Sequence, residues 1–256
     1  MFGLEFPPIN ALLRWKDIFP TFNKIALIAV LAALIGIVVF YLASRKDPKV
    51  APTGTRNFAE TSIEFIEQQI VMPTIGKQGL GWTPFLLSLF VFIFLCNIPG
   101  VIPIFQMPAT ARLAIPLGLS LVVWLIYIGV GMKHQGFGYF GHLLWPPGVP
   151  TALKPLVGLI EFISTIVVTP FSLTVRLMAN LMAGHILLVT FGLLAESLFW
   201  ARTNQAILIP TGILPFIMLI FVTVFEVLVA FLQAYIFAIL AGVYIGNSMA
   251  GHGDDH

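Results

Sequence analysis

Charged residues are scarce in this sequence: they make up 9% of its 256 residues, whereas hydrophobic residues make up 59%. Soluble domains carry about 25% charged residues, so the composition excludes an ordinary soluble domain and a disordered chain. The single cysteine, Cys96, excludes an intramolecular disulfide and a cysteine-based metal site. A net charge of +2 from dispersed basic residues indicates no nucleic-acid partner. The sequence therefore predicts a polytopic membrane protein surrounded by lipid.

Long apolar runs predict about five membrane crossings. A helix that crosses a bilayer needs about 20 apolar residues. The sequence offers such runs at about residues 25–44, 82–105, 113–132, 155–200 and 207–246. The last two are longer than one crossing requires, so each is either tilted or bent, and Pro170 and Pro215 are available for a bend.

Basic residues between the runs predict the orientation. Arg45, Lys46, Lys49 and Arg56 follow the first run, and an excess of lysine and arginine marks the cytoplasmic side. With five crossings, the amino terminus is then outside and the carboxyl terminus inside. We expect residues 1–24 to be an extracytoplasmic segment and residues 25–256 a single membrane domain.

Two further segments predict structure at the membrane surface. Residues 57–72 form an amphipathic helical pattern. Its apolar face carries Phe58, Phe65, Ile66 and Ile70, and its polar face carries Glu60, Glu64 and Glu67. Residues 134–153 are interrupted by glycine and proline, so we expect them at the interface, with Tyr139 and Trp145 at headgroup depth.

Few ionisable residues occur in the last two runs, and burying each of them in a bilayer is costly. They are Glu161, Arg176, His185, Glu196 and Glu226. Glu196 lies close to Arg202, where solvation explains it, and a lone histidine is usually a neutral core residue. Arg176 keeps its charge at any accessible pH and lies several turns from either end of its run. It is the residue that a purely structural role explains least.

Helical geometry places these residues relative to one another. At 100° per residue, His185 and Arg176 face opposite sides of one helix. The face of Arg176 carries Ala179 and Ala183, small residues that let another membrane helix approach closely.

An antiparallel arrangement of the last two helices also predicts depth, because residues at equal depth have nearly constant sums of residue numbers. By this rule His185 lies level with Glu226, and Arg176 lies level with Gln233. Glu161 lies roughly 22 Å from Arg176 toward the cytoplasm along a straight helix. Titratable groups therefore lie on both sides of a permanent cation, which interrupts a proton path. A mobile carboxylate that this chain does not contain would have to complete the path.

Three motifs resemble subunit a of the F-type ATP synthase. They are PFSLTVRLMANLMAGH at 170–185, EVLVAFLQAYIFA at 226–238 and FLCNIPGVIP at 94–103. The resemblance covers most of residues 55–250. It implies an all-α fold in which the last two helices form a long tilted hairpin against a c-ring, whose subunits carry the mobile carboxylate. Peripheral-stalk b subunits are the other partners that it implies, and it implies no cofactor.

The resemblance also implies roles for individual residues. Arg176 corresponds to the essential stator arginine, and Glu161 to an acidic residue on the exit side. The interval from Glu161 to Pro170 is one residue longer than the resemblance leads us to expect. The inlet half-channel would be formed by Asn180, His185, Glu226 and Gln233.

The leading interpretation is a proton-conducting stator subunit that is not itself catalytic, since no G-x-x-x-x-G-K-[ST] phosphate loop is present. An independent channel or secondary transporter is the alternative, although no internal repeat is visible. An inert scaffold leaves Arg176 unexplained. The bacterial plasma membrane is the expected location, with the mitochondrial inner membrane as the alternative, and sodium coupling stays open.

Overall fold

The computed structural model describes residues 24–44, 54–102, 110, 113–136, 138–145, 153–199 and 205–250. Every regular element in these ranges is helical. Five helical stretches there are long and apolar enough to cross a membrane: Ile25–Ala43, Lys77–Gly100, Ala114–Gln135, Lys154–Leu198 and Gly212–Met249. The prediction of an all-α polytopic membrane protein is confirmed. Residues 1–23 and the basic residues Arg45, Lys46 and Lys49 lie outside the described part of the chain.

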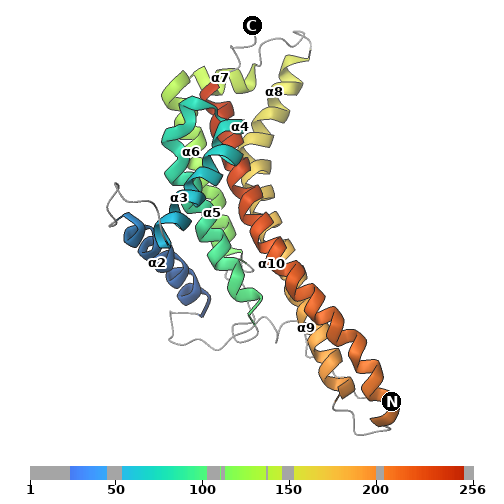
Figure 1. The fold of residues 1–256 in the computed structure, drawn as a ribbon. Coiled ribbons are helices and arrows are strands. Elements are labelled where there is room, and N and C mark those ends of the chain that lie inside the picture. Colours follow the sequence, from blue (N-terminus) through green and yellow to red (C-terminus); the bar gives the residue numbers. More distant parts are fainter. Residues whose placement is uncertain are drawn as a thin grey trace.

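The helices follow one another as shown in Figure 1. In the first half of the chain they are α2 (Lys24–Ser44), α3 (Thr55–Ile66), the π-helical η1 (Glu67–Val71), α4 (Met72–Thr74), the 3₁₀-helical η2 (Lys77–Trp82), α5 (Thr83–Asn97) and η3 (Ile98–Gly100). In the second half they are α6 (Ala114–Gln135), α7 (Gly138–Leu144), α8 (Lys154–Ile163), the π-helical η5 (Ser164–Val168), α9 (Thr169–Phe199) and α10 (Gln205–Ala250).

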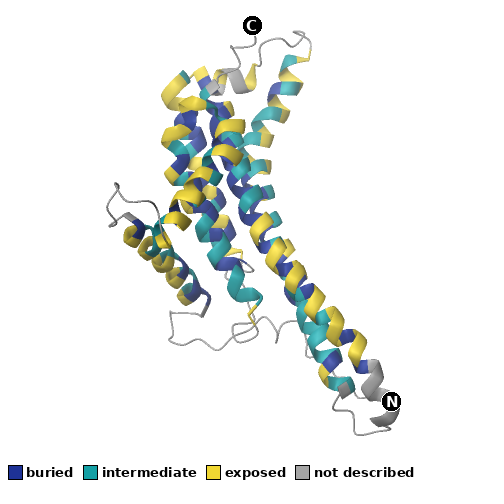
Figure 2. Cartoon of the chain, viewed as in Figure 1, coloured by how far each residue is buried: buried dark blue, intermediate teal, exposed yellow. Residues whose placement is uncertain are grey.

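The two longest helices, α9 and α10, run antiparallel and pack against each other (Figure 1). One half of α10 also packs on α5 and α6, and α6 packs on α9. At their other ends α9 and α10 project together beyond the remaining helices. This projecting half of α10 is exposed on much of its surface, including Phe221, Val224 and Leu228 (Figure 2).

A stripe of alanines lets α10 approach its neighbours closely. The stripe consists of Ala230, Ala234, Ala238 and Ala241, and all four are fully buried. Small residues at such spacing allow close backbone contact, which drives helix association where lipid removes the usual hydrophobic gain. Around the stripe, large side chains from several helices fill the core, among them Ile66, Ile70, Leu86, Ile93, Leu173, Leu177 and Ile245.

The amphipathic segment predicted for the membrane surface is helical but packs on protein. Ile66 and Ile70 are fully buried, and the ring of Phe65 lies 5.8 Å from that of Phe90 and 6.1 Å from that of Phe231. Only Phe58, at the start of the expected apolar face, is exposed. The difference arises because periodicity identifies an apolar face without showing whether lipid or other helices will cover it.

A π-helical turn separates α8 from α9 where Pro170 interrupts the hydrogen bonding. In a π helix the carbonyl of each residue accepts from the N–H five residues later. Pro170 has no N–H, so the carbonyl of Thr165 has no backbone donor. The Tyr127 hydroxyl replaces that donor at 2.5 Å. A π turn takes up one residue more than an α turn, so Glu161 and Pro170 lie on either side of a locally widened helix.

The predicted interfacial segment contains the short helix α7, which folds back against α6. Tyr139 is buried, and its ring occupies the space that a side chain at Gly131 would need. Trp145, in contrast, is exposed.

Candidate functional site

The polar residues singled out from the sequence gather on α9 and α10, apart from Glu161. On α10, Glu226 is 6% exposed and Gln233 is 3% exposed, and on α9, His185 is 6% exposed. Arg176 is half-buried and Asn180 is exposed. Polar side chains buried to this extent within apolar helices are expensive to maintain, so their concentration at one helix contact indicates a functional site.

The carboxyl group of Glu226 lies directly against the backbone of Gly184. A side chain at position 184 would overlap both carboxyl oxygens of Glu226. Gly184 precedes His185, so the carboxylate of α10 and the imidazole of α9 lie at the same level of the antiparallel pair. No hydrogen bond joins Glu226 to His185 among the described residues.

One turn deeper along α9, the side-chain amide of Asn180 donates a hydrogen bond of 3.0 Å to the Gln233 side-chain oxygen. Helix geometry had placed Gln233 level with Arg176. In the structure its amide instead pairs with Asn180, four residues further along α9. The Glu226 carboxylate and the hydrogen-bonded amides of Asn180 and Gln233 therefore follow one another along the contact between α9 and α10. We call this row of side chains the polar line.

Arg176 lies beyond this line, on a face of α9 that other parts of the described chain leave open. Asn180, Ala183 and Leu187 follow Arg176 at helical spacing and all three are exposed. Arg176 takes part in no ion pair within the described ranges. A fixed positive charge next to small exposed side chains is suited to a carboxylate that approaches from outside this chain.

The opposite side of the same turn of α9 is anchored to α6. The hydroxyls of Ser120 and Thr174 lie 2.6 Å apart, and both residues are buried. Thr174 also donates to the carbonyl of Pro170 at 2.7 Å. This contact fixes the turn of α9 that carries Arg176 against the rest of the protein.

Glu161 belongs to a different neighbourhood, near α7 and the end of α10. Burial raises the pKa of the Tyr139 hydroxyl, a hydrogen bond with Ser248 lowers it, and the nearby Glu161 carboxylate raises it. These three residues thus form a second polar group, separated from Glu226 and His185 by the π turn and by the turn of Arg176.

Sequence reasoning missed two features of the site. Gly184 could have been identified, because it is a glycine within a helix and its residue number places it opposite Glu226. The contact of Ser120 with Thr174 carried no comparable signal, since hydroxyl residues in membrane helices often bond to their own helix backbone.

Known proteins of one family match this chain over most of its length. A sequence family described as ATP synthase A chain matches residues 25–246. The ATP synthase subunit a of Frankia alni is 40% identical over 234 residues, which are 91% of this chain and 78% of that protein. The subunit a of Rhodococcus erythropolis is 37% identical, over 91% of this chain and 84% of its own. That of Maricaulis maris is 37% identical, over 90% of both chains.

Proposed function

Because this chain belongs to the ATP synthase subunit a family, we propose that it forms two proton half-channels that load and unload carboxylates on a rotating c-ring. As a family member it is a multi-pass membrane component of the ATP synthase complex. It takes part in proton transport and ATP synthesis and is not itself catalytic. We further propose that the chain contacts the c-ring and the b subunits of the peripheral stalk, and that it lies in a bacterial plasma membrane.

The proposal assigns proton entry to the polar line of α9 and α10. Glu226 and His185 can each exist with or without a proton, and they lie at one level of the helix contact. Asn180 and Gln233 cannot titrate, so they would hold water or orient a passing proton donor. Protons would pass from Glu226 and His185 along this line to a ring carboxylate at the open face of α9.

In this proposal Arg176 separates the proton entry path from the proton exit path. A guanidinium keeps its proton and repels another positive charge, so protons cannot pass it along this chain. A deprotonated ring carboxylate, in contrast, is attracted to it. The ring carboxylate would therefore be neutralised on the entry side and travel around the ring. It would lose its proton toward Glu161 and Tyr139, the second polar group, before it returns to Arg176.

The single observation that carries the proposal is the contact of the Glu226 carboxylate with Gly184. The same pair of helices carries Arg176 on the face of α9 that the described chain leaves uncovered. A test uses inverted membrane vesicles with and without this chain. Its removal should abolish ATP-driven acidification while ATP hydrolysis by the catalytic head continues.

The alternative of an independent channel makes the opposite prediction for the chain alone. We expect the purified chain in liposomes to conduct no protons under an imposed pH gradient, because the path is interrupted at Arg176. Sustained proton flux through the isolated chain would overturn the stator proposal in favour of a channel.

A further inference from the structure

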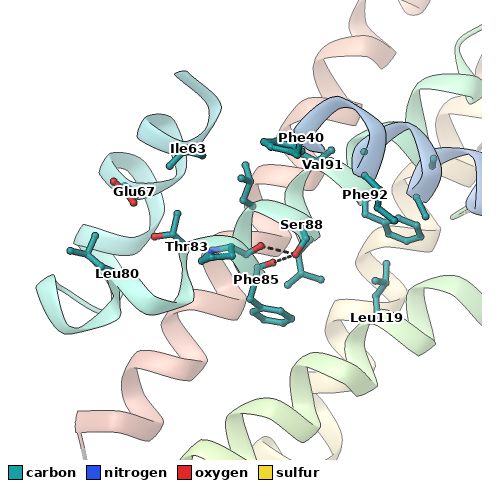
Figure 3. Close-up of a pocket in the computed structure, with 17 residues that line it drawn as sticks. Phe40, Ile63, Glu67, Leu80, Thr83, Phe85, Ser88, Val91, Phe92 and Leu119 are labelled. Carbon is teal, nitrogen blue, oxygen red and sulfur yellow. Dashed lines mark hydrogen bonds between the residues drawn. The ribbon is translucent and has the colours of Figure 1, made fainter. Parts of the chain in front are cut away.

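A pocket of about 750 Å³ lies between α2, α3 and α5, away from the contact of α9 with α10 (Figure 3). Its size is typical of ligand sites, which range from about 300 to 1,000 Å³. The walls are mostly apolar, with Phe40 on α2, Val91 and Phe92 on α5, and Leu119 on α6. Gly36 on α2 faces this wall, since a Cβ there would lie 3.6 Å from Val91, an ordinary van der Waals contact.

The pocket is elongated along the helices. On α5 its lining extends from Thr83 to Phe92, and on α2 from Phe40 back to Ala32. Nine residues of helix correspond to about 14 Å, so the pocket extends from the first turn of a membrane helix about halfway across the hydrocarbon layer. An apolar slot of this length and orientation fits an extended acyl chain.

One end of the pocket is polar, and it is the end at the start of α5. Thr83 is 4% exposed, and its hydroxyl has no hydrogen-bond partner among the described residues. The Glu67 carboxylate points toward the same end from η1 (Figure 3). A buried hydroxyl without a partner is unfavourable, and a hydroxyl and a carboxylate together can both accept from one donor group.

The charges around this end select a zwitterionic headgroup. Glu67 attracts a cation with N–H donors, and the exposed Lys77 begins η2, whose Leu80 also lines the pocket. A lipid phosphate can meet the lysine while a primary ammonium donates to Glu67 and Thr83. A quaternary ammonium has no N–H to donate, and an anionic headgroup has no cation to pair with the carboxylate, so its hydroxyls could offer Glu67 only neutral hydrogen-bond donors.

We propose that the pocket between α2, α3 and α5 binds a phospholipid with a primary-amine headgroup. Its ammonium bonds to Glu67 and Thr83, and one of its acyl chains fills the slot between α2 and α5. This site is separate from the proton path and does not depend on the proposed half-channels.

The test uses the intact ATP synthase complex in lipid vesicles and a phosphatidylethanolamine with a photoreactive diazirine in one acyl chain. Mapping by mass spectrometry should locate the cross-links on residues 32–40 of α2 and 83–92 of α5. Unlabelled phosphatidylethanolamine should compete about tenfold better than phosphatidylcholine or phosphatidylglycerol, as expected for a hydrogen bond to a charged group. Equal competition by the three lipids, or cross-links only elsewhere, would overturn the proposal.

Three substitutions and a matched control complete the test. Glu67→Gln and Thr83→Val should each lower pocket labelling several-fold, and Gly36→Leu should abolish it by filling the slot. Glu64→Gln, on the same helical segment but hydrogen-bonded to Gln68 and outside the pocket lining, should change nothing. Unchanged labelling in both Glu67→Gln and Thr83→Val would contradict the proposed headgroup contacts. The competition between lipids on the unmodified complex decides the matter even if a variant fails to assemble.

Discussion

The carboxyl group of Glu226 occupies the space where a side chain at Gly184 would be. Glycine within a helix costs about 1 kcal/mol relative to alanine, so its presence here needs a compensating reason. The reason is steric, because only a residue without Cβ lets the carboxylate of α10 reach the backbone of α9 beside His185. The position of the titratable group beside the backbone of α9 therefore depends on the absence of a side chain at Gly184.

We expect Gly184→Ala to lower ATP-driven proton pumping at least tenfold while the complex still assembles. The methyl group would displace the Glu226 carboxylate from its place beside His185. Acidification of inverted vesicles measures the effect, with subunit composition checked by gel. Gly192→Ala is the matched control, since a Cβ at Gly192 of the same helix meets nothing within 4 Å. Equal effects of the two substitutions would show that the contact of Gly184 with Glu226 is not specific.

His185 and Glu226 should behave as one proton-handling pair. We expect the exchange of His185→Glu with Glu226→His to recover more pumping than either substitution alone, because both chemistries return at the same depth. A double-mutant cycle on pumping rates in inverted vesicles measures this coupling. If the two single effects simply multiply, the residues do not share a site.

The hydrogen bond from Asn180 to Gln233 should make a small but measurable contribution to stability. Side-chain hydrogen bonds between membrane helices contribute about 0.6 kcal/mol on average. We expect the double-mutant cycle of Asn180→Ala and Gln233→Ala to give a coupling energy of that order in unfolding of the purified chain in detergent. A coupling energy of zero would mean that the two amides do not interact.

Tyr127→Phe should destabilise the protein by about 1–3 kcal/mol, because it leaves the Thr165 carbonyl without a donor at the π turn. The loss should appear as a lower melting temperature of the purified chain in detergent. Tyr244→Phe is the control: its ring lies 5.6 Å from that of Tyr127, and it has no hydrogen bond of its own among the described residues. A larger effect of the control would indicate that ring packing, not the hydroxyl, stabilises this region.

The sequence predicted those features that depend on one helix at a time. Hydropathy alone placed a membrane helix over residues 113–132, and the structure has α6 over Ala114–Gln135. Arg176 was identifiable because a permanent charge within an apolar run is costly whatever surrounds it. One relation between two helices was also predicted: the equal depth of His185 and Glu226 followed from antiparallel geometry and agrees with the contact at Gly184.

Features that depend on the relation between helices were less predictable. Counting residues placed Gln233 level with Arg176, but side-chain length and helix rotation decide the hydrogen bond, and its partner is Asn180. Pro170 was noted as a possible bend, but it did not show that a π turn over Ser164–Val168 would precede it. Similarly, the apolar face with Ile66 and Ile70 was predicted to lie on the membrane surface, whereas helices α5 and α10 cover it in the structure.

The account depends most on Arg176 as the barrier between two proton paths. The most direct measurement compares ATP-driven acidification and passive proton leak in inverted vesicles that carry Arg176→Ala, after assembly has been checked. The account predicts that pumping is lost and that the leak rises, because nothing then separates the two polar groups. Arg176→Lys should restore little, because its compact ammonium can lose its proton. Normal coupled pumping by the Arg176→Ala complex would contradict the account.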